Sequence, residues 1–169
     1  MKTDTIQDQL VYATIRILAA DGKEASIGTG FFVTEIPVDG NDPFLVTNKH
    51  VVGKFNKAQF IFCAADSDNK PIDSAHVTIT VSNLQDRIIP HPDDNVDLCF
   101  INLKDAIDQA SREGKSPFFI AIGTDFFITE EALSHMTAIE NVIMIGYPEG
   151  LMDAVNNKPV VRKGITLQA

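Results

Sequence analysis

The chain has 169 residues, of which 44% are apolar and 22% are charged. This composition is that of a globular protein, and the length fits one domain or two small domains that share an interface. Lys and Arg number 14 against 23 Asp and Glu, which gives a net charge of −9 with no basic cluster to offset it, so a nucleic-acid or anionic-membrane partner is disfavoured.

Cysteine usage and the N-terminus narrow the class of protein further. Two cysteines, Cys63 and Cys99, exclude a disulfide framework and a cysteine-based zinc site, and we expect two buried thiols. The first ten residues contain two aspartates where a secretory signal needs a basic start and an apolar stretch. No window approaches the roughly 20 consecutive apolar residues that span a bilayer. We therefore expect a soluble, cytoplasmic protein.

The first part of the chain shows the alternation typical of strands. Residues 10–34 predict a β-hairpin with its turn at Asp21-Gly22. A polar loop at 36–43 is expected next, followed by a short apolar strand at 44–47. That strand leads directly into His50.

Further strands follow at a spacing of about ten residues. Residues 58–65 and 75–81 predict two of them, and Leu-Cys-Phe-Ile at 98–101 gives the strongest signal of a buried strand. Short strands at this spacing are typical of an all-β barrel or sandwich.

The second part of the chain is less regular. Residues 104–115 are polar with weak helical spacing, which predicts a linker. A short helix is predicted at 130–136, capped by Thr129. Residues 142–145 predict another buried strand, and residues 160–166 predict one more.

His50 and Asp97 form the candidate site. A lone histidine at the end of a strand is more often structural than catalytic, but Asp97 lies at the mouth of the most apolar strand, where a carboxylate is costly to bury unless it is paired. A buried Asp that accepts a hydrogen bond from one ring nitrogen of a His fixes its tautomer and leaves the other nitrogen as a general base. We expect the two side chains within hydrogen-bonding reach, with Asp94 as the next candidate for the carboxylate.

Four segments of the chain resemble the trypsin-like (chymotrypsin-fold) serine peptidases, in particular their bacterial, HtrA-like branch. They are Gly-Thr-Gly-Phe at 28–31, Leu-Val-Thr-Asn-Lys-His-Val-Val at 45–52, Asp-Asn-Val-Asp-Leu-Cys-Phe-Ile at 94–101, and Ile-Gly-Tyr-Pro-Glu-Gly at 145–150 with Val-Arg-Lys-Gly-Ile-Thr at 161–166. The last of these is similar to the opening strands of the second barrel in bacterial members.

The resemblance implies an all-β fold, a trypsin-like double β-barrel. A closed first barrel would span residues 8–103 and carry both site residues, 104–136 would be a linker with a short helix, and 137–169 an incomplete second barrel. The implied activity is endopeptidase hydrolysis of protein or peptide substrates by acyl transfer, without a metal or organic cofactor. In it His50 is the general base and then the general acid, and Asp97 is the orienting carboxylate.

The family's nucleophile is missing from this chain. It lies in a Gly-x-Ser-Gly-type element downstream of both site residues, and the sequence has none. One hypothesis, which we favour because the sequence ends in mid-strand, is an N-terminal fragment of a peptidase that is inactive alone. The alternatives are a naturally short pseudo-peptidase that binds peptide along a barrel edge, and a β-barrel scaffold without chemistry. An incomplete second barrel would have an open edge that permits self-association.

The remaining histidines show no spacing typical of metal ligands. We expect His76 and His135 on the surface and His91 in an exposed loop beside Asp93 and Asp94. A loop that binds a hard cation needs more oxygen ligands at regular spacing. The sequence therefore predicts no metal site.

Overall fold

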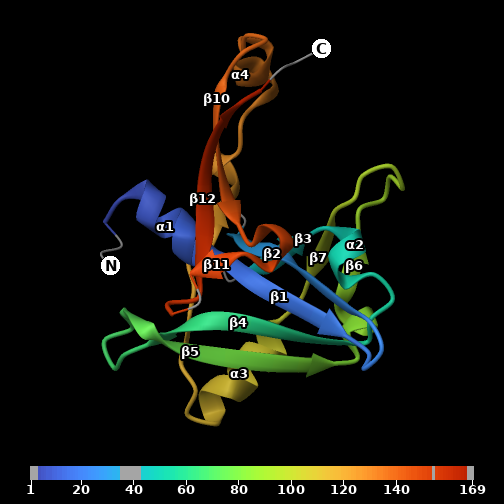
Figure 1. Cartoon of the computed structure of the whole chain (residues 1–169), viewed down its shortest axis with the longest axis vertical. Helices are drawn as coiled ribbons and strands as arrows, with labels where there is room; N and C mark the ends of the chain where they lie inside the picture. The colour runs from blue at the N-terminus through green and yellow to red at the C-terminus, as the bar shows by residue number, and fades with distance from the viewer. Residues whose placement is uncertain (1–3, 35–42, 154, 167–169) are drawn as a thin grey trace.

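The computed structural model describes residues 4–34, 43–153 and 155–166. In this part the chain is mostly β, with antiparallel sheets and few helices. One sheet has nine strands and the other three (Figure 1). The loop predicted at 36–43 falls outside the described residues except for its last position.

The predicted N-terminal hairpin is formed by β1 (Thr14–Ala20) and β2 (Ala25–Thr34). Its turn is confirmed, since the Asp21 carboxylate accepts hydrogen bonds from two backbone amides of the turn. Residues 10–13, predicted as strand, belong instead to helix α1 (Ile6–Ala13). Thr5 caps this helix by accepting a hydrogen bond from the Asp8 amide, so a local cap outweighs the alternation that continues into β1.

The nine-stranded sheet follows the order β5-β4-β1-β2-β3-β7-β6, with β8 paired to β4 and β9 paired in parallel to β2. Its other strands are β3 (Phe44–Thr47), β4 (Lys57–Ala65), β5 (Pro71–Ser82), β6 (Ile88–Pro90), β7 (Cys99–Ile101), β8 (Pro117–Phe118) and β9 (Ile122–Gly123). The strands predicted at 44–47, 58–65 and 75–81 are thereby confirmed.

The closed first barrel predicted for residues 8–103 is not present in the described residues. The two end strands of the order, β5 and β6, share no ladder there and are connected by the 3-10 helix η1 (Leu84–Arg87). A barrel closes only when its end strands pair. Strand β6 has three residues, and one of them, Pro90, has no N–H to donate. The sheet is curved around its core but open along this edge.

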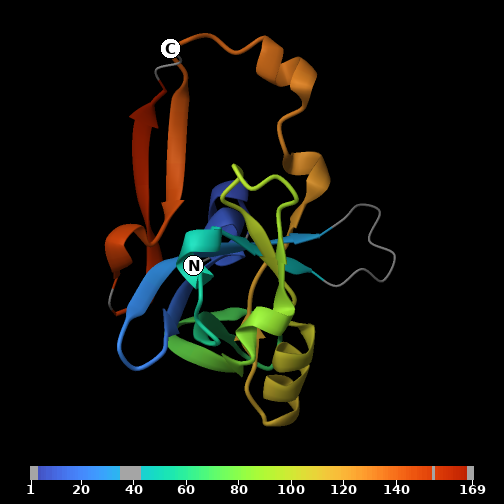
Figure 2. The same cartoon turned by 90° about the vertical axis from the view of Figure 1, so that its right-hand side faces the viewer.

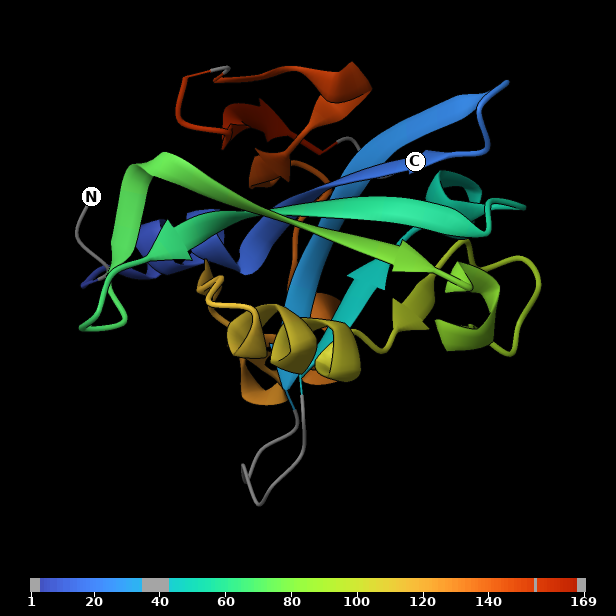
Figure 3. The ribbon, with the colours of Figure 1, turned by 90° about the horizontal axis from the view of Figure 1, so that it is seen from below.

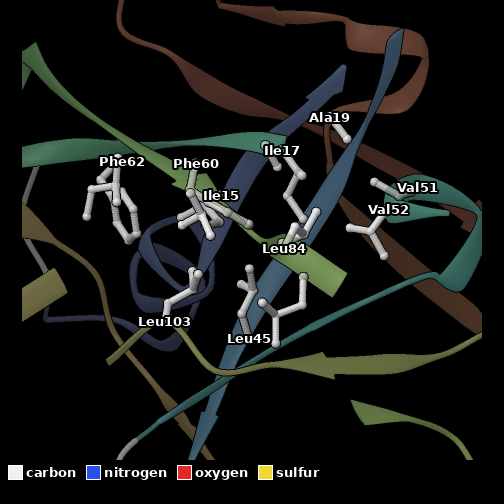
Figure 4. Packing of buried hydrophobic residues seen from close by; sticks show 14 of the residues in the cluster. Ile15, Ile17, Ala19, Leu45, Val51, Val52, Phe60, Phe62, Leu84 and Leu103 are labelled. Carbon is white, nitrogen blue, oxygen red and sulfur yellow. The ribbon is translucent and has the colours of Figure 1, made fainter. Parts of the chain in front are cut away.

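The core lies on the concave face of this sheet. Figure 4 shows Ile15 and Ile17 of β1 packed with Phe60 and Phe62 of β4 and with Leu45 of β3. These side chains are at most 2% exposed. The predicted linker contributes helix α3 (Lys104–Arg112), which packs against β5 and β8 below the sheet (Figure 3). Together with β8 and β9, the segment 104–136 thus contributes structure to the larger sheet.

The smaller sheet has the order β10-β12-β11 and comprises β10 (Asn141–Gly146), β11 (Met152–Asp153) and β12 (Lys158–Ile165). The short 3-10 helix η3 (Pro148–Gly150) lies between β10 and β11. Another 3-10 helix, η2 (Thr124–Phe126), directly follows β9 of the larger sheet. The β10–β12 hairpin extends away from the larger sheet, and helix α4 (Glu130–Ser134) lies on the segment that leads into it (Figure 2). The predicted Thr129 cap is confirmed, since its hydroxyl accepts a hydrogen bond from the Ala132 amide at 3.1 Å.

The positions of the two predicted strands near the C-terminal end are right, but the burial predicted for 142–145 is wrong. Ile143 is 62% exposed, and Val142 and Met144 are exposed as well. A strand is buried only when elements cover both faces of its sheet, and over residues 141–144 no described element does so. In the described residues, no helix has the length and apolar character needed to cross a membrane.

Candidate active site

His50 is held by a single helical turn, α2 (Lys49–Val52), that begins directly after β3. Val51 and Val52 are buried, at 4% and 1% exposure, and anchor the turn in the core. Gly28 of β2 lies directly against Val51, so the turn sits close to the sheet. His50, on the other side of the turn, projects into solvent.

Asp97 reaches His50 because of the register between β3 and β7. Thr47 is paired with Cys99, so the residues just after β3 and just before β7 lie side by side. The Asn48 side-chain amide donates a 2.8 Å hydrogen bond to the backbone carbonyl of Asp97. Two segments distant in sequence are thus joined beside the helical turn.

The predicted proximity of His50 and Asp97 is confirmed. His50 Nδ1 lies 2.5 Å from Asp97 Oδ2, and the His50 backbone amide donates a hydrogen bond of 3.1 Å to Asp97 Oδ1. Both carboxylate oxygens therefore bond the same residue, one through its ring and one through its backbone. This geometry places the Nδ1 proton toward Asp97 and leaves Nε2 as the nitrogen that can accept a proton.

The burial predicted for Asp97 is wrong, because its side chain is 48% exposed and that of His50 is 71% exposed. Asp97 precedes β7 by two residues and lies outside its ladder. The strand at 98–101 is not continuously buried either: Cys99 and Ile101 face the core, whereas Leu98 and Phe100 are 41% and 45% exposed. The pair stands in solvent at the end of β3 and the beginning of β7.

The pKa of the Asp97 carboxyl lies below its usual range, mainly because the carboxylate accepts a hydrogen bond from the His50 side chain. Burial acts in the opposite direction, and the His50 backbone amide adds to the lowering. Asp97 is therefore the ionised partner at neutral pH, as an orienting carboxylate must be.

None of the described serines forms a hydrogen bond with His50, whose polar contacts are those with Asp97. In the described part of the chain, no group of three or more His, Cys, Asp or Glu side chains could hold a metal ion. Among the described residues, the site thus consists of a histidine paired with a carboxylate, without a serine bonded to the histidine.

The polar residues that support the site were not singled out from the sequence. Asn48 ties Asp97 to the end of β3, and the Lys49 ammonium donates to the Asp93 carbonyl at 3.3 Å. Thr47 donates its hydroxyl to the Thr29 carbonyl at 2.7 Å and is 2% exposed. The available signal was the polar run Thr-Asn-Lys before His50, because polar residues at the end of a buried strand need partners.

The other candidate residues lie as follows. His76, His91 and His135 are exposed, as predicted, and His91 Nδ1 accepts a hydrogen bond from the Asp93 amide. The buried thiol predicted for Cys99 is confirmed at 2% exposure, whereas Cys63 is only partly buried.

No protein-family model, no curated protein and no solved structure matches this chain.

Proposed function

We propose that this chain carries the acid–base half of a trypsin-like serine endopeptidase site. The observation that carries the proposal is the pairing of His50 Nδ1 with Asp97 Oδ2, with the backbone amide of the same histidine bonded to the second carboxylate oxygen. Two bonds to one residue fix the ring's position and its tautomer together. That is the arrangement a general base needs when it acts on a weakly acidic hydroxyl.

The reaction begins when His50 Nε2 removes the proton from a serine hydroxyl, whose oxygen attacks the carbonyl carbon of a peptide bond. The imidazolium then gives that proton to the leaving amine as the C–N bond breaks. Water enters by the same route, losing a proton to Nε2 and releasing the acyl group from serine, whose oxygen is reprotonated. Asp97 stabilises the imidazolium in both halves without taking the proton.

The exposure of the pair supports this role. The His50 side chain is 71% exposed, so Nε2 is open to a substrate and to a nucleophile on another segment. The order of the four motifs along the chain, with the histidine before the aspartate, is also that of the trypsin-like peptidases. The nucleophile in this proposal is a serine outside the 169 residues, so the chain alone is inactive.

A binding module without catalysis is the second candidate function. It is favoured by the lack of any hydrogen bond between His50 and a serine among the described residues, and by the exposed apolar side chains along β10 and β12. Such a module would bind extended peptide by adding it as a strand to a free sheet edge.

The coding sequence that follows Ala169 separates the two candidates. The peptidase proposal expects an in-frame Gly-x-Ser-Gly element, and the chain extended to include it should hydrolyse a denatured protein substrate. His50→Ala should abolish this hydrolysis, with His91→Ala, an exposed histidine outside the pair, as the matched control. A stop codon directly after Ala169, or hydrolysis that persists in His50→Ala, would contradict the peptidase proposal.

A further inference from the structure

A series of polar contacts on the outer face of the larger sheet attaches the smaller one to it. On this face Thr29, Arg16 and Ile61 lie side by side on β2, β1 and β4. Their neighbours along each strand, such as Ile17 and Phe60, face the core on the other side. The smaller sheet therefore docks on the convex face and leaves the core undisturbed.

Tyr147 forms the end of this series that lies on β2. Its backbone amide donates a 2.8 Å hydrogen bond to the Thr29 hydroxyl, and its ring is 2% exposed. The Tyr147 hydroxyl donates to the Asn157 carbonyl at 2.8 Å, and the Asn157 side chain donates to the Ile61 carbonyl of β4. Tyr147 thus bonds to β2 through its backbone amide and to the turn before β12 through its hydroxyl.

Lys158 forms the other end, three strands away at β5. Its ammonium lies 2.7 Å from Asp73 Oδ1 and 3.8 Å from the centre of the Tyr12 ring, and its side chain is only 15% exposed. The Tyr12 hydroxyl donates to the same carboxylate oxygen at 2.7 Å. Helix α1, strand β5 and strand β12 meet at these three side chains.

The cluster is stabilised as a unit because each group compensates the burial of another. Burial would raise the pKa of the Asp73 carboxyl, but hydrogen bonds from Lys158 and Tyr12 hold it well below its usual range. Burial and the bond to Asp73 raise the pKa of Tyr12. Replacing Lys158 removes its ion pair with the partly exposed Asp73 carboxylate, which favours separation of the segments that carry the two residues.

We propose that Lys158 is a positioning residue that fixes the orientation of the β10–β12 hairpin relative to His50. Tyr147 and Asn157 attach the smaller sheet to β2 and β4. The Lys158 contact adds a further attachment at β5, the strand farthest from Thr29 among those that the smaller sheet contacts. Any effect of this orientation on catalysis rests on the proposed function, in which the smaller sheet would carry the nucleophile segment toward His50 Nε2. The Lys158 contact itself can be tested without measuring activity.

The two cysteines provide separate reporters of docking and unfolding. Cys63 lies on β4 beside this cluster, where the charges of Lys158 and Asp73 both act on its pKa. Cys99 lies in the core of the larger sheet at 2% exposure. Loss of docking should expose Cys63 alone, whereas unfolding of the larger sheet should expose both.

The test is the rate of alkylation of each thiol by iodoacetamide in the native chain, resolved by mass spectrometry. In Lys158→Met, which keeps the apolar stem, we expect Cys63 to react at least tenfold faster and Cys99 at its original rate. The positive charge of Lys158 lowers the pKa of Cys63, so its loss alone would slow the reaction. Faster labelling therefore reports exposure.

Lys163→Met is the matched control, because Lys163 lies exposed on the same strand, and it should leave both rates unchanged. An unchanged or slower Cys63 rate in Lys158→Met, a parallel increase at Cys99, or an equal effect of Lys163→Met would each overturn the proposal. If Lys158→Met does not fold, Tyr12→Phe removes only the hydroxyl bond to Asp73 and should accelerate Cys63 alone; no acceleration would overturn the proposal. None of these results bears on whether His50 and Asp97 catalyse.

Discussion

Gly28 of β2 and Val51 of α2 are packed so closely that a Cβ atom at position 28 would lie 2.4 Å from Val51 Cγ2. Val51 follows His50 directly, so the lack of a side chain at position 28 sets how near the histidine turn approaches the sheet. Van der Waals contacts do not allow a carbon–carbon distance this short. The close packing at Gly28 therefore helps to set the position of the site.

Gly28→Ala is expected to destabilise the fold by about 1–3 kcal/mol, because the added methyl group must displace Val51. Val51→Ala in the same chain should relieve the overlap, so the double variant should lose less stability than the two single changes add up to. Gly164→Ala, where the nearest atom would be 3.7 Å from the new Cβ, is the control. Urea denaturation measures all four, and strictly additive losses would contradict the contact.

The exposed side chains of β10 should make the chain self-associate. Residues 142–145 are apolar and uncharged, and in the described residues β10 pairs with β12 alone, so its other edge has unpaired backbone groups. Ile143→Glu should weaken association and keep the hairpin, because position 143 faces Lys163 in register and the new pair is of opposite charge.

Sedimentation velocity over a dilution series measures this association. The average mass of the native chain should rise with concentration, and that of Ile143→Glu should rise less. Ile89→Glu, at a site 52% exposed on β6, should behave like the native chain. A monomer at all concentrations would contradict the open edge and favour the naturally short binding module.

The acid titration of Asp97 should depend on His50. The His50 side chain holds the pKa of the Asp97 carboxyl below its usual range, so His50→Ala should raise that pKa toward the usual range of an aspartate. A carboxyl with a lowered folded-state pKa stabilises the fold above its unfolded-state pKa, and this contribution is lost as the pH falls through the folded-state value. His50→Ala should therefore lose less stability on acidification. Carbon-13 NMR of the carboxyl gives the midpoint, and an unchanged midpoint would contradict the pairing.

The chain alone should not react with a fluorophosphonate probe. Labelling needs an activated serine, and no described serine is hydrogen-bonded to His50; each missing oxyanion donor also costs about 3–4 kcal/mol of transition-state stabilisation. Gel fluorescence after incubation should match that of His50→Ala. Labelling of a serine that His50→Ala abolishes would show that a nucleophile lies within the chain.

The local turn and capping patterns and the pairing of His50 with Asp97 were predictable from the sequence. The turn at Asp21 and the cap at Thr129 each depend on side chains a few residues apart, and both are found. The His50–Asp97 contact was predictable from the resemblance of the motifs that carry the two residues, whereas the burial argument for it is wrong because Asp97 is 48% exposed.

Burial was less predictable, because it depends on elements that cover a strand from elsewhere in the chain. The apolar run at 142–145 reads as a buried strand, yet Ile143 is 62% exposed. Whether the sheet closes likewise depends on pairing between β5 and β6, which cannot be predicted from the residues of either strand alone. The cluster of Lys158, Asp73 and Tyr12 joins three segments distant in sequence. It could not be predicted from any one of these segments alone.

The tautomer of His50 tests the central claim most directly, since a general base needs its proton on Nδ1 and a free Nε2. Nitrogen-15 NMR of the neutral imidazole should show the Nδ1–H form in the native chain. In Asp97→Asn, which keeps the shape of the side chain, the Nδ1–H form should give way to the Nε2–H form or to a rapid mixture. A native chain with its proton on Nε2, or a tautomer that Asp97→Asn leaves unchanged, would contradict the assignment of His50 and Asp97 as base and orienting carboxylate.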